Sequence, residues 1–448
     1  MNDKNQAISI LGVGDIFVAK RLPEKKYCGF DEIKNLISTH DACFGNLETT
    51  VHDNEGYPSA FPGGGYAMAN PSVLDDLKGF GFNVLSIANN HALDYCHKGL
   101  EATIRNLKEA GITYVGAGRN LVEASIPKYV ECREGRVAFI GVTSSYHDTD
   151  AAGPQGGIVS GRPGINPLRR IEYYEVTEEN YQALSKVAEE TGMNDGYKWA
   201  IANGYRQESE ELFLREMKFV KGSCNRMVNH PLPADIERVT NAILEARIQS
   251  DCVVVSFHSH QMNGSADKPA EFIVEFCHAC IDAGANVIFG HGSHELRGLE
   301  IYKNAPIFYG LNEFILHNEM QEVLPYEFYE RLHQEPSKYD YVGMGMNLRS
   351  NGGTRGLSAD HKAWEAVAAS VSMVNHQVNE IRVYPVSLGF EKDRSQRGWP
   401  VIDKTGRILD YFCKLSSDNY GTRFELMDGY ARVPIIYKSV NHESETRI

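Results

Sequence analysis

The sequence lacks a long apolar run. No window approaches the roughly 18 consecutive apolar residues that mark a transmembrane helix. Its first residues, Met1 to Gln6, also lack the basic start and apolar segment of a secretory signal. We therefore expect a cytoplasmic protein that does not engage a membrane.

The sequence also lacks an excess of positive charge. It has 59 acidic and 45 basic residues, for a formal net charge of −14. Nucleic-acid binding requires a basic face, and anionic lipid attracts basic segments, so this balance argues against both partners. We expect a small-molecule partner instead, and the composition leaves a homo-oligomer open.

Disulfide and zinc frameworks are missing as well. The nine cysteines are odd in number and scattered, a usage typical of free thiols in a reducing compartment. Cys277 and Cys280 form a lone C-x-x-C with no second pair spaced to match, so we interpret them as buried thiols of a helix.

With 448 residues, the chain exceeds the usual limit of about 250–300 residues for one core. Strands that alternate with helices indicate an α/β protein, and we expect one large core with insertions. The predicted segments are a first half of the core at 1–165, a helical insertion over the sheet edge at 166–232, a second half of the core at 233–320 and a C-terminal extension at 321–448. The extension is mostly polar and charged, and its stretch from Val378 to Leu388 predicts a strand that returns to the core.

One stretch organises the chemistry. The apolar run from Val84 to Ala88 predicts a short buried strand, and Asn89, Asn90 and His91 follow it directly. Ligands of open α/β sheets bind at the carboxyl ends of strands, so these side chains are candidates for a site. Asp94 follows three residues after His91, and we expect it to orient His91 or to cap the turn.

Four further apolar strands end in the same kind of residue: Asp15, Glu48, His258 with His260, and His291 with His294. Carboxylate, amide and imidazole groups are all metal ligands; imidazole suits Zn or Fe, and carboxylate suits Mn or Mg. The alternative is a set of turn residues and hydrogen-bonded histidines. Five strands with such ends favour a divalent metal site of one or two ions.

The order of these motifs resembles the CapA family of poly-γ-glutamate capsule biosynthesis proteins, in the calcineurin-like metallophosphoesterase superfamily. The resemblance lies in Gly14-Asp15, Asn46-Leu47-Glu48, Asn89-Asn90-His91, His258, Gly290-His291 with His294, and 306–315. It implies a four-layer α/β/β/α sandwich of the metallophosphoesterase type. It also implies metal ligands at Asp15, Glu48, Asn90, His258 and His291 or His294, with His91 as the acid/base residue.

The sequence departs from this pattern at two motifs. Phe17 stands where the superfamily usually has a histidine, which weakens the case for a two-metal site. His258-Ser259-His260-Gln261 replaces a His-Trp-Gly-x-Glu motif of the family. These departures predict a substrate different from that of the capsule proteins.

Several reactions use such an apparatus. We expect hydrolysis of an amide, peptide or γ-glutamyl bond at a metal-polarised carbonyl. Peptide epimerisation is an alternative in which two of Glu48, His91 and His294 supply the acid/base pair, and phosphoester hydrolysis is another. A non-catalytic scaffold for polyglutamate synthesis is the fourth possibility. For substrate contact we select Arg297, His260 and Arg162.

Overall fold

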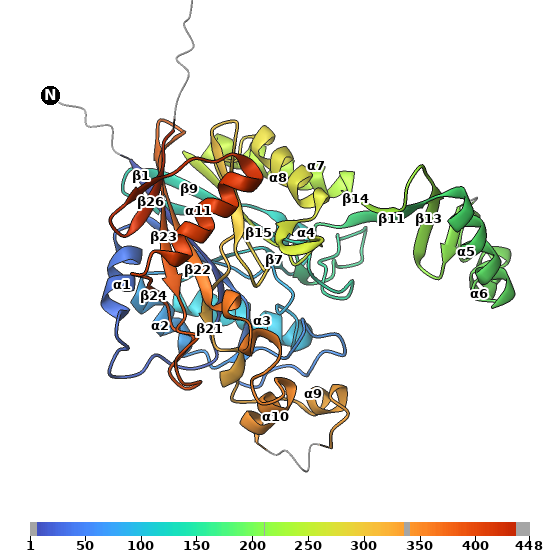
Figure 1. The fold of residues 1–448 in the computed structure, drawn as a ribbon, viewed down its shortest axis with the longest axis horizontal. Coiled ribbons are helices and arrows are strands. Elements are labelled where there is room, and N and C mark those ends of the chain that lie inside the picture. The colour runs from blue at the N-terminus through green and yellow to red at the C-terminus, as the bar shows by residue number, and fades with distance from the viewer. Residues whose placement is uncertain (1–6, 210, 336–340, 436–448) are drawn as a thin grey trace, which may run out of the picture.

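The computed structural model describes residues 7–209, 211–335 and 341–435. Two stacked sheets form the centre, and helices cover the outer face of each (Figure 1). The layers are helices, a ten-stranded sheet, a six-stranded sheet and helices again. The predicted α/β/β/α sandwich is therefore confirmed.

The ten-stranded sheet combines strands from the first 115 residues with strands from residue 313 onward. Its strand order is β25-β26-β23-β22-β1-β2-β5-β6, while β21 pairs with β1 and β24 with β23. The parallel members are β1 (Ile8–Phe17), β2 (Ala42–Leu47), β5 (Val84–Ser86), β6 (Thr113–Val115) and β21 (Glu313–Leu316). The antiparallel members are β22 (Glu365–Val374), β23 (Gln377–Ser387), β24 (Val401–Ile402), β25 (Glu425–Met427) and β26 (Tyr430–Val433).

The six-stranded sheet has the order β19-β20-β18-β15-β9-β8. Its four inner strands are parallel: β9 (Gly135–Thr143), β15 (Cys252–His258), β18 (Val287–His291) and β20 (Ala305–Gly310). Its two edges are antiparallel, β8 (Lys128–Cys132) and β19 (Arg297–Tyr302). All seven residues of β15 are buried, as expected for a parallel strand covered on both faces.

Aromatic rings fill the space between the sheets. Phe44 of β2 stacks with Phe139 of β9 and Phe289 of β18, with centroids 5.9 and 6.0 Å apart. All three side chains are fully buried. These contacts fix the two sheets face to face, so strand ends of both sheets meet at one edge.

The outer helices present one apolar face each. The ten-stranded sheet is covered by α1 (Phe30–Ser38), α2 (Val73–Phe80) and α3 (Cys96–Ala110). The six-stranded sheet is covered by α7 (Pro233–Gln249) and α8 (Glu271–Ala283). Cys277 and Cys280 are buried in α8 and all nine cysteines are free, which confirms the prediction of free thiols.

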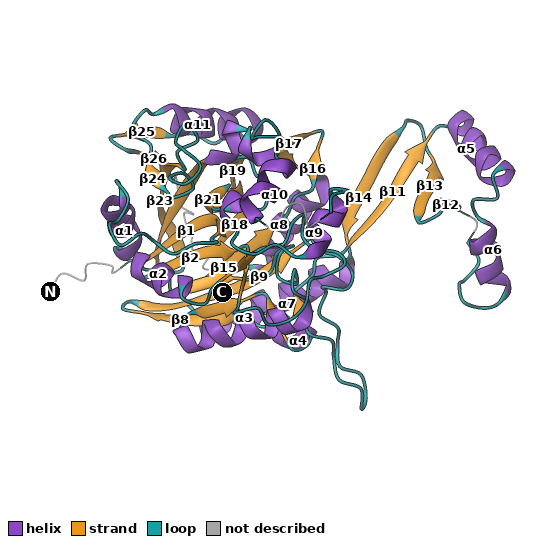
Figure 2. Ribbon diagram, turned by 90° about the horizontal axis from the view of Figure 1, so that it is seen from below, coloured by secondary structure: helices purple, strands orange, loops and turns teal. Residues whose placement is uncertain are grey.

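The inserted segment differs from the prediction. Residues 170–231 form an arm that projects from the sandwich rather than covering a sheet edge (Figures 1 and 2). The arm has two helices, but it also has a four-stranded sheet, so the prediction of a helical insertion is wrong. Its elements are β11 (Arg170–Val176), α5 (Glu178–Glu190), α6 (Asp195–Ala202), β12 (Leu212–Leu214), β13 (Met217–Lys221) and β14 (Arg226–Pro231).

The C-terminal part is more structured than predicted. The strand expected from Val378 to Leu388 is β23, but β22, β24, β25 and β26 also join the sheet, and α11 (Arg407–Tyr420) packs against β19 and β23. The extension, which was predicted to be mostly polar and charged, is thus largely core among the described residues. Before β22, α9 (Tyr326–Arg331), η1 (Asn318–Met320) and α10 (Val342–Arg349) lie on one side of the sandwich (Figure 1).

The remaining elements are short: β3 (Thr50–Val51), β4 (Met68–Ala69), β7 (Ala117–Gly118), α4 (Leu121–Ser125), β10 (Gly164–Ile165), β16 (Met262–Asn263), β17 (Ser265–Pro269), η3 (Gly356–Ser358) and η4 (His361–Trp364). Among the described residues, no helix is both long and apolar enough to span a membrane.

Candidate metal centre

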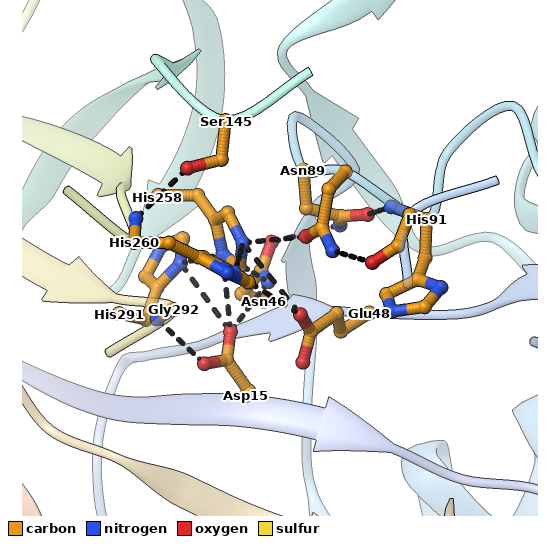
Figure 3. A network of polar contacts seen from close by, with 12 residues as sticks. Asp15, Asn46, Glu48, Asn89, His91, Ser145, His258, His260, His291 and Gly292 are labelled. Atoms are coloured by element: carbon orange, nitrogen blue, oxygen red, sulfur yellow. Dashed lines mark hydrogen bonds and ion pairs between the residues drawn. The ribbon is translucent and has the colours of Figure 1, made fainter. Parts of the chain in front are cut away.

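Strand register brings the predicted polar residues together. In the ten-stranded sheet, Asp15 of β1 is the register partner of Asn46 on β2 and of Glu313 on β21. In the six-stranded sheet, His258 of β15 pairs with His291 of β18. Because both sets end at the same edge, carboxylates from one sheet face imidazoles from the other (Figure 3).

Asp15 is fully buried and tightly held. Its Oδ1 accepts a hydrogen bond of 2.6 Å from the Asn46 side chain, and its Oδ2 accepts one of 2.7 Å from the Gly292 N–H. Burial opposes its charged form, but interaction with the His258 and His291 rings and the hydrogen bond from Asn46 hold the pKa of Asp15 well below its usual range, which favours the ionised carboxylate.

His258 lies at the centre of the cluster. Its Nδ1 is 3.0 Å from His291 Nδ1 and 3.4 Å from Asp15 Oδ1. Its Nε2 is 2.8 Å from Asn90 Oδ1 and 3.0 Å from His260 Nε2. Close approach of ring nitrogens to one another leaves lone pairs turned toward a shared space.

Burial favours the neutral form of the three histidines, which is the form that binds a metal. Burial lowers the pKa of His258 against the opposing charge of Asp15, and it lowers that of His291 to about 3. Burial, followed by the charge of His258, places the pKa of His260 well below its ordinary value. Ser256 Oγ lies 2.8 Å from His291 Nε2 and fixes that ring.

Glu48 is the clearest sign of a cation. It is fully buried, and none of the described residues donates a hydrogen bond to either of its carboxylate oxygens. Burial, and then the charges of Asp15, Glu313 and Asp94, raise the pKa of Glu48 well above its usual value. A buried carboxylate without partners costs several kcal/mol, and a bound cation removes that cost.

The ligand atoms are close enough for a metal ion. Three sets each have one ligand atom per residue within 4.8 Å of the others. They are Asp15 with His258 and His291, Glu48 with His258 and His260, and Asp15 with Glu48 and Glu313. Mixed imidazole and carboxylate donors of this kind fit Zn, Fe or Mn.

His91 forms a buried pair with Asp94 beside this cluster. His91 Nδ1 lies 2.6 Å from Asp94 Oδ2, and the backbone N–H of His91 donates a hydrogen bond to Asn89 Oδ1 at 3.1 Å. Asp94 also accepts the N–H groups of Gly63 and Ala67 at 2.8 and 2.7 Å. Its carboxylate thus orients the ring and ties it to the 63–67 loop.

Phe17 stands at the position where the first motif usually has a histidine. Its ring packs edge-on against His91, with centroids 5.4 Å apart at 87°. The position therefore supports the candidate acid/base residue instead of contributing a ligand.

His294 pairs with Glu313 instead of joining a ligand set. Its Nδ1 lies 2.7 Å from Glu313 Oε1, and His294 is in none of the three sets. The pKa of His294 is raised: burial would lower it, but the hydrogen bond and the charge of Glu313 outweigh burial. Burial raises the pKa of Glu313 to about 7. In this geometry His291, not His294, is the ligand candidate, and His294 with Glu313 forms a second histidine–carboxylate pair.

Two predicted substrate contacts are wrong. Arg297 is fully buried and its guanidinium donates to backbone carbonyls, at 2.8 Å to Ala266 and 2.9 Å to Gln261, so it supports the loop after His258. Arg162 is exposed and donates to the carbonyl of Ala151 at 2.8 Å. Neither lines the cavity at the cluster, whereas His260 does.

That cavity has a volume of about 200 Å³. His91, His260, His294 and Glu313 line its polar side. Its other walls are glycines 63–65, Arg349 and an apolar set: Phe17, Tyr66, Leu316, Leu324, Phe328, Met346 and Leu357. Both histidine–carboxylate pairs thus face one chamber.

Three residues of the site escaped the sequence analysis. Glu313 and Asn46 stand within quoted motifs, but only the register shows that both lie beside Asp15. Arg349 ends α10 in a segment interpreted as polar extension, and no local pattern marks it as part of a cavity.

Fold and site together define an α/β/β/α sandwich protein with a candidate metal centre at its strand ends. The model of one family, described as bacterial capsule synthesis protein PGA_cap, matches residues 9–318. The chain belongs to this family, and the predicted resemblance is confirmed.

Relatives extend over different shares of the chain. Uncharacterized protein y4sH of Sinorhizobium fredii is 30% identical over 436 residues, 94% of this chain and 91% of that protein. Capsule biosynthesis protein CapA of Bacillus anthracis is 25% identical over 320 residues, 70% of this chain and 60% of CapA. A probable polyglutamine synthesis accessory protein of Mycobacterium tuberculosis is 26% identical over 276 residues, 61% and 55% of the two chains.

Solved structures are more distant. A hypothetical protein from Thermus thermophilus matches with a TM-score of 0.35 and 12% identity, over 84% of this chain and 98% of that one. A putative 5'-nucleotidase from Staphylococcus aureus matches with a TM-score of 0.37 and 11% identity, over 89% and 55%.

Proposed function

We propose that this chain is a metal-dependent enzyme that acts on a carbonyl of a peptide, amide or γ-glutamyl substrate, by hydrolysis in the first instance. The observation that carries the proposal is Glu48, whose buried carboxylate oxygens have no hydrogen-bond partner among the described residues and lie close to two histidines, His258 and His260. The residues that would hold the ion are Asp15, Glu48, His258, His260 and His291, with Asn90 and Glu313 beside them.

A divalent cation in such a site supplies Lewis-acid polarisation of a carbonyl and lowers the pKa of a nearby water. The chain's own contribution is the movement of a proton. Asp94 occupies His91 Nδ1, which leaves Nε2 to exchange a proton with the substrate. The apolar walls of the 200 Å³ chamber exclude bulk water from that exchange.

The first experiment is elemental analysis of protein purified without chelator. Wild type should carry one or two equivalents of Mn, Fe or Zn, and the Asp15→Ala and His291→Ala variants should lose it. His278→Ala is the matched control, because this histidine pairs with Glu300 away from the cluster and its loss should leave the metal in place. A peptide library digested by wild type but not by His91→Ala then tests hydrolysis.

Other outcomes of this experiment have definite meanings. Two equivalents together with turnover of phosphoesters, but not of peptides, would replace the proposal by phosphoester hydrolysis. A protein without metal after reconstitution, whose site variants keep a wild-type cellular phenotype, would replace it by the scaffold.

Epimerisation at a peptide α-carbon is the second candidate, and a specific observation favours it. Inversion requires one group to remove the α-proton and another to return it on the opposite face. Two histidine–carboxylate pairs, His91–Asp94 and His294–Glu313, line the same chamber. Both rings therefore reach one substrate.

Heavy water separates the two reactions. Epimerisation incorporates one deuterium at the α-carbon without chain cleavage, whereas hydrolysis gives new termini and no α-deuterium. If His294→Ala abolishes α-exchange from one stereoisomer only, the two-group mechanism holds. Cleavage without exchange in wild type rejects it.

A further inference from the structure

The chamber at the histidines continues into a second one. The outer cavity has a volume of about 710 Å³ and shares five lining residues with the inner cavity of about 200 Å³. They are His294, Asn318, Met346, Arg349 and Leu357. Anything that passes from the outer cavity to the histidines passes these side chains.

Arg349 is the cation at this junction, and it lacks a counter-ion among the described residues. Its nearest hydrogen-bond acceptor there is the carbonyl of Gly64 at 3.4 Å, and no carboxylate of the same part of the chain forms an ion pair with it. Some arginines of this acidic chain are paired with carboxylates, as Arg21 is with Asp76 and Arg394 with Glu319, whereas Arg162 and Arg297 donate to backbone carbonyls. Arg349 is exposed, so its guanidinium is accessible to an anion that enters the cavity.

The surroundings favour an anion as its partner. Burial among the cavity walls, and then the nearby charge of Arg331, lower the pKa of Arg349. Two like charges close together repel, and an anion between the cavity wall and the guanidinium removes that repulsion. A planar guanidinium also matches carboxylate and phosphate oxygens in a bidentate manner.

The glycine loop ties Arg349 to the metal centre. A Cβ on Gly65 would lie 2.9 Å from Arg349 Nη1, so the side chain can approach only because residue 65 is a glycine. In the same loop, the carbonyl of Gly63 accepts from Asn90 Nδ2 at 2.5 Å and its N–H donates to Asp94. One loop thus positions Arg349, a candidate ligand and the partner of His91.

We propose that Arg349 forms a binding subsite for an oxyanion, a carboxylate or a phosphate group, carried by the substrate next to its reacting carbonyl. The proposal rests on the proposed function, since it assigns the anionic group to the substrate of that site. It makes the enzyme selective for an acidic residue or chain end close to the bond that reacts. Among the described residues that line the inner chamber, Arg349 is the one with a fixed positive charge.

Calorimetric titration of chelator-treated protein tests the subsite without turnover. The probes are glutarate, as a carboxylate, and inorganic phosphate. Arg349→Gln should weaken binding of the preferred anion by at least about tenfold, the loss of one charge-assisted hydrogen bond. Gly65→Ala should weaken it less, because a methyl group displaces the end of a flexible side chain without straining the backbone.

Two further variants separate this inference from the metal. Arg355→Gln is the matched control, since Arg355 lines only the outer cavity and its loss should leave binding unchanged. Asp15→Ala should lose metal and keep anion binding, so the subsite stands even if the metal proposal fails. If Arg349→Gln binds both probes as strongly as wild type does, the subsite proposal is overturned. It is also overturned if neither wild type nor the variant binds either probe at millimolar concentration.

The probe that binds identifies the anionic group that the substrate carries. Binding of glutarate over phosphate assigns a carboxylate, in agreement with peptide or γ-glutamyl chemistry. Binding of phosphate alone assigns a phosphate group and directs the search for substrates toward phosphoesters. Circular dichroism of Arg349→Gln checks its fold, which should be intact because the residue lies at the end of α10 and remains partly in contact with solvent.

Discussion

The sandwich and the arm distribute their charges in opposite ways. At the strand ends of the sandwich, Asp15, Glu48 and His258 are fully buried. In the arm, charges pair at the surface, as Arg226 does with Glu175 at 2.6 Å and Lys221 with Glu178 at 2.9 Å. The same residue types therefore have different energetic consequences in the two regions.

Surface pairs of the arm contribute little, about 0–1 kcal/mol each, since water solvates both partners anyway. The buried carboxylates of the sandwich cost free energy unless something compensates them. Buried groups of this kind mark the strand ends of the sandwich as the candidate functional site. The arm instead exposes aromatic surface, with Trp199 and Tyr205 stacked and 61% and 74% exposed.

The largest effect should come from Glu48→Gln in the sandwich. Metal at one hundred times its dissociation constant should stabilise wild type by about 2.7 kcal/mol. The variant should show no such gain, because the amide removes the charge that faces the histidines. Thermal unfolding with and without Mn²⁺ or Zn²⁺ measures the difference.

Without metal, Glu48→Gln should unfold at or above the wild-type temperature, since it removes a buried carboxylate that has no hydrogen-bond partner among the described residues. The matched control is Glu175→Gln in the arm, whose response to metal should equal that of wild type. A variant of Glu48 that still gains full stability from metal would remove this residue from the site.

Asp94→Asn should have the next effect. The amide cannot keep all three hydrogen bonds of the carboxylate, to His91, Gly63 and Ala67, so the His91 ring loses its fixed orientation. We expect turnover to fall by about 10–100-fold with metal content unchanged. Kinetics paired with elemental analysis separates the two properties.

Asp150→Asn controls for the loss of a buried loop carboxylate. Asp150 accepts the N–H of His147 and the Thr149 hydroxyl and contacts no histidine ring of the cluster. Its variant should keep wild-type turnover. Equal losses in both variants would mean that Asp94 acts only through the loop.

The ion pairs of Asp235, at the junction of the arm and the sandwich, should make the free energy of unfolding depend on pH. Asp235 on α7 accepts two hydrogen bonds from the Arg169 side chain, at 2.7 and 2.9 Å, and pairs with Arg238. Burial opposes the charge, but the two arginines lower the pKa of Asp235 below its usual value. The stabilisation is thus complete above the unfolded-state pKa of about 3.9 and disappears as the pH falls below it.

Asp235→Asn should therefore lower the free energy of unfolding by about 3 kcal/mol at pH 7. The gap between variant and wild type should narrow as the pH falls below the unfolded-state pKa of about 3.9. Urea unfolding across this range measures it. A constant gap would mean that Asp235 stabilises through packing alone.

The core site was predictable because of topology. Parallel strands buried on both faces appear in a sequence as short apolar runs, and the polar residues that follow them must meet at one edge. Asp15, His258 and His291 were found in this way. Glu313 was not, because β21 is short and joins β1 from the far end of the chain.

Other errors share a physical origin. β22 is rich in small residues, Ala366, Ala368 and Ala369 among them, and lacks the bulky apolar pattern of a core strand although it pairs with β1. In β11 and β13, charged residues alternate with aromatics on exposed surfaces, which resembles a charged helix. Arg297 is the first residue of β19 and its side chain is buried. Its position in the sequence, after the histidine motif, does not show which way the side chain points.

The smallest effect should come from removal of the arm. Tyr173 and Val228 are register partners, so a two-residue Asn-Gly turn can replace residues 174–227. The shortened chain keeps the hydrogen bond from the Phe272 N–H to Asn229, which anchors β14 to α8. Because distant sites contribute independently, we expect metal content unchanged and the free energy of unfolding of the sandwich within about 0.5 kcal/mol of wild type. Elemental analysis and urea unfolding check both.

If the truncated protein loses its metal, the arm supports the strand ends from a distance, and the division between a chemical sandwich and a separate arm is wrong. If it keeps its metal but loses turnover on long substrates alone, the exposed aromatic residues of the arm contact the substrate.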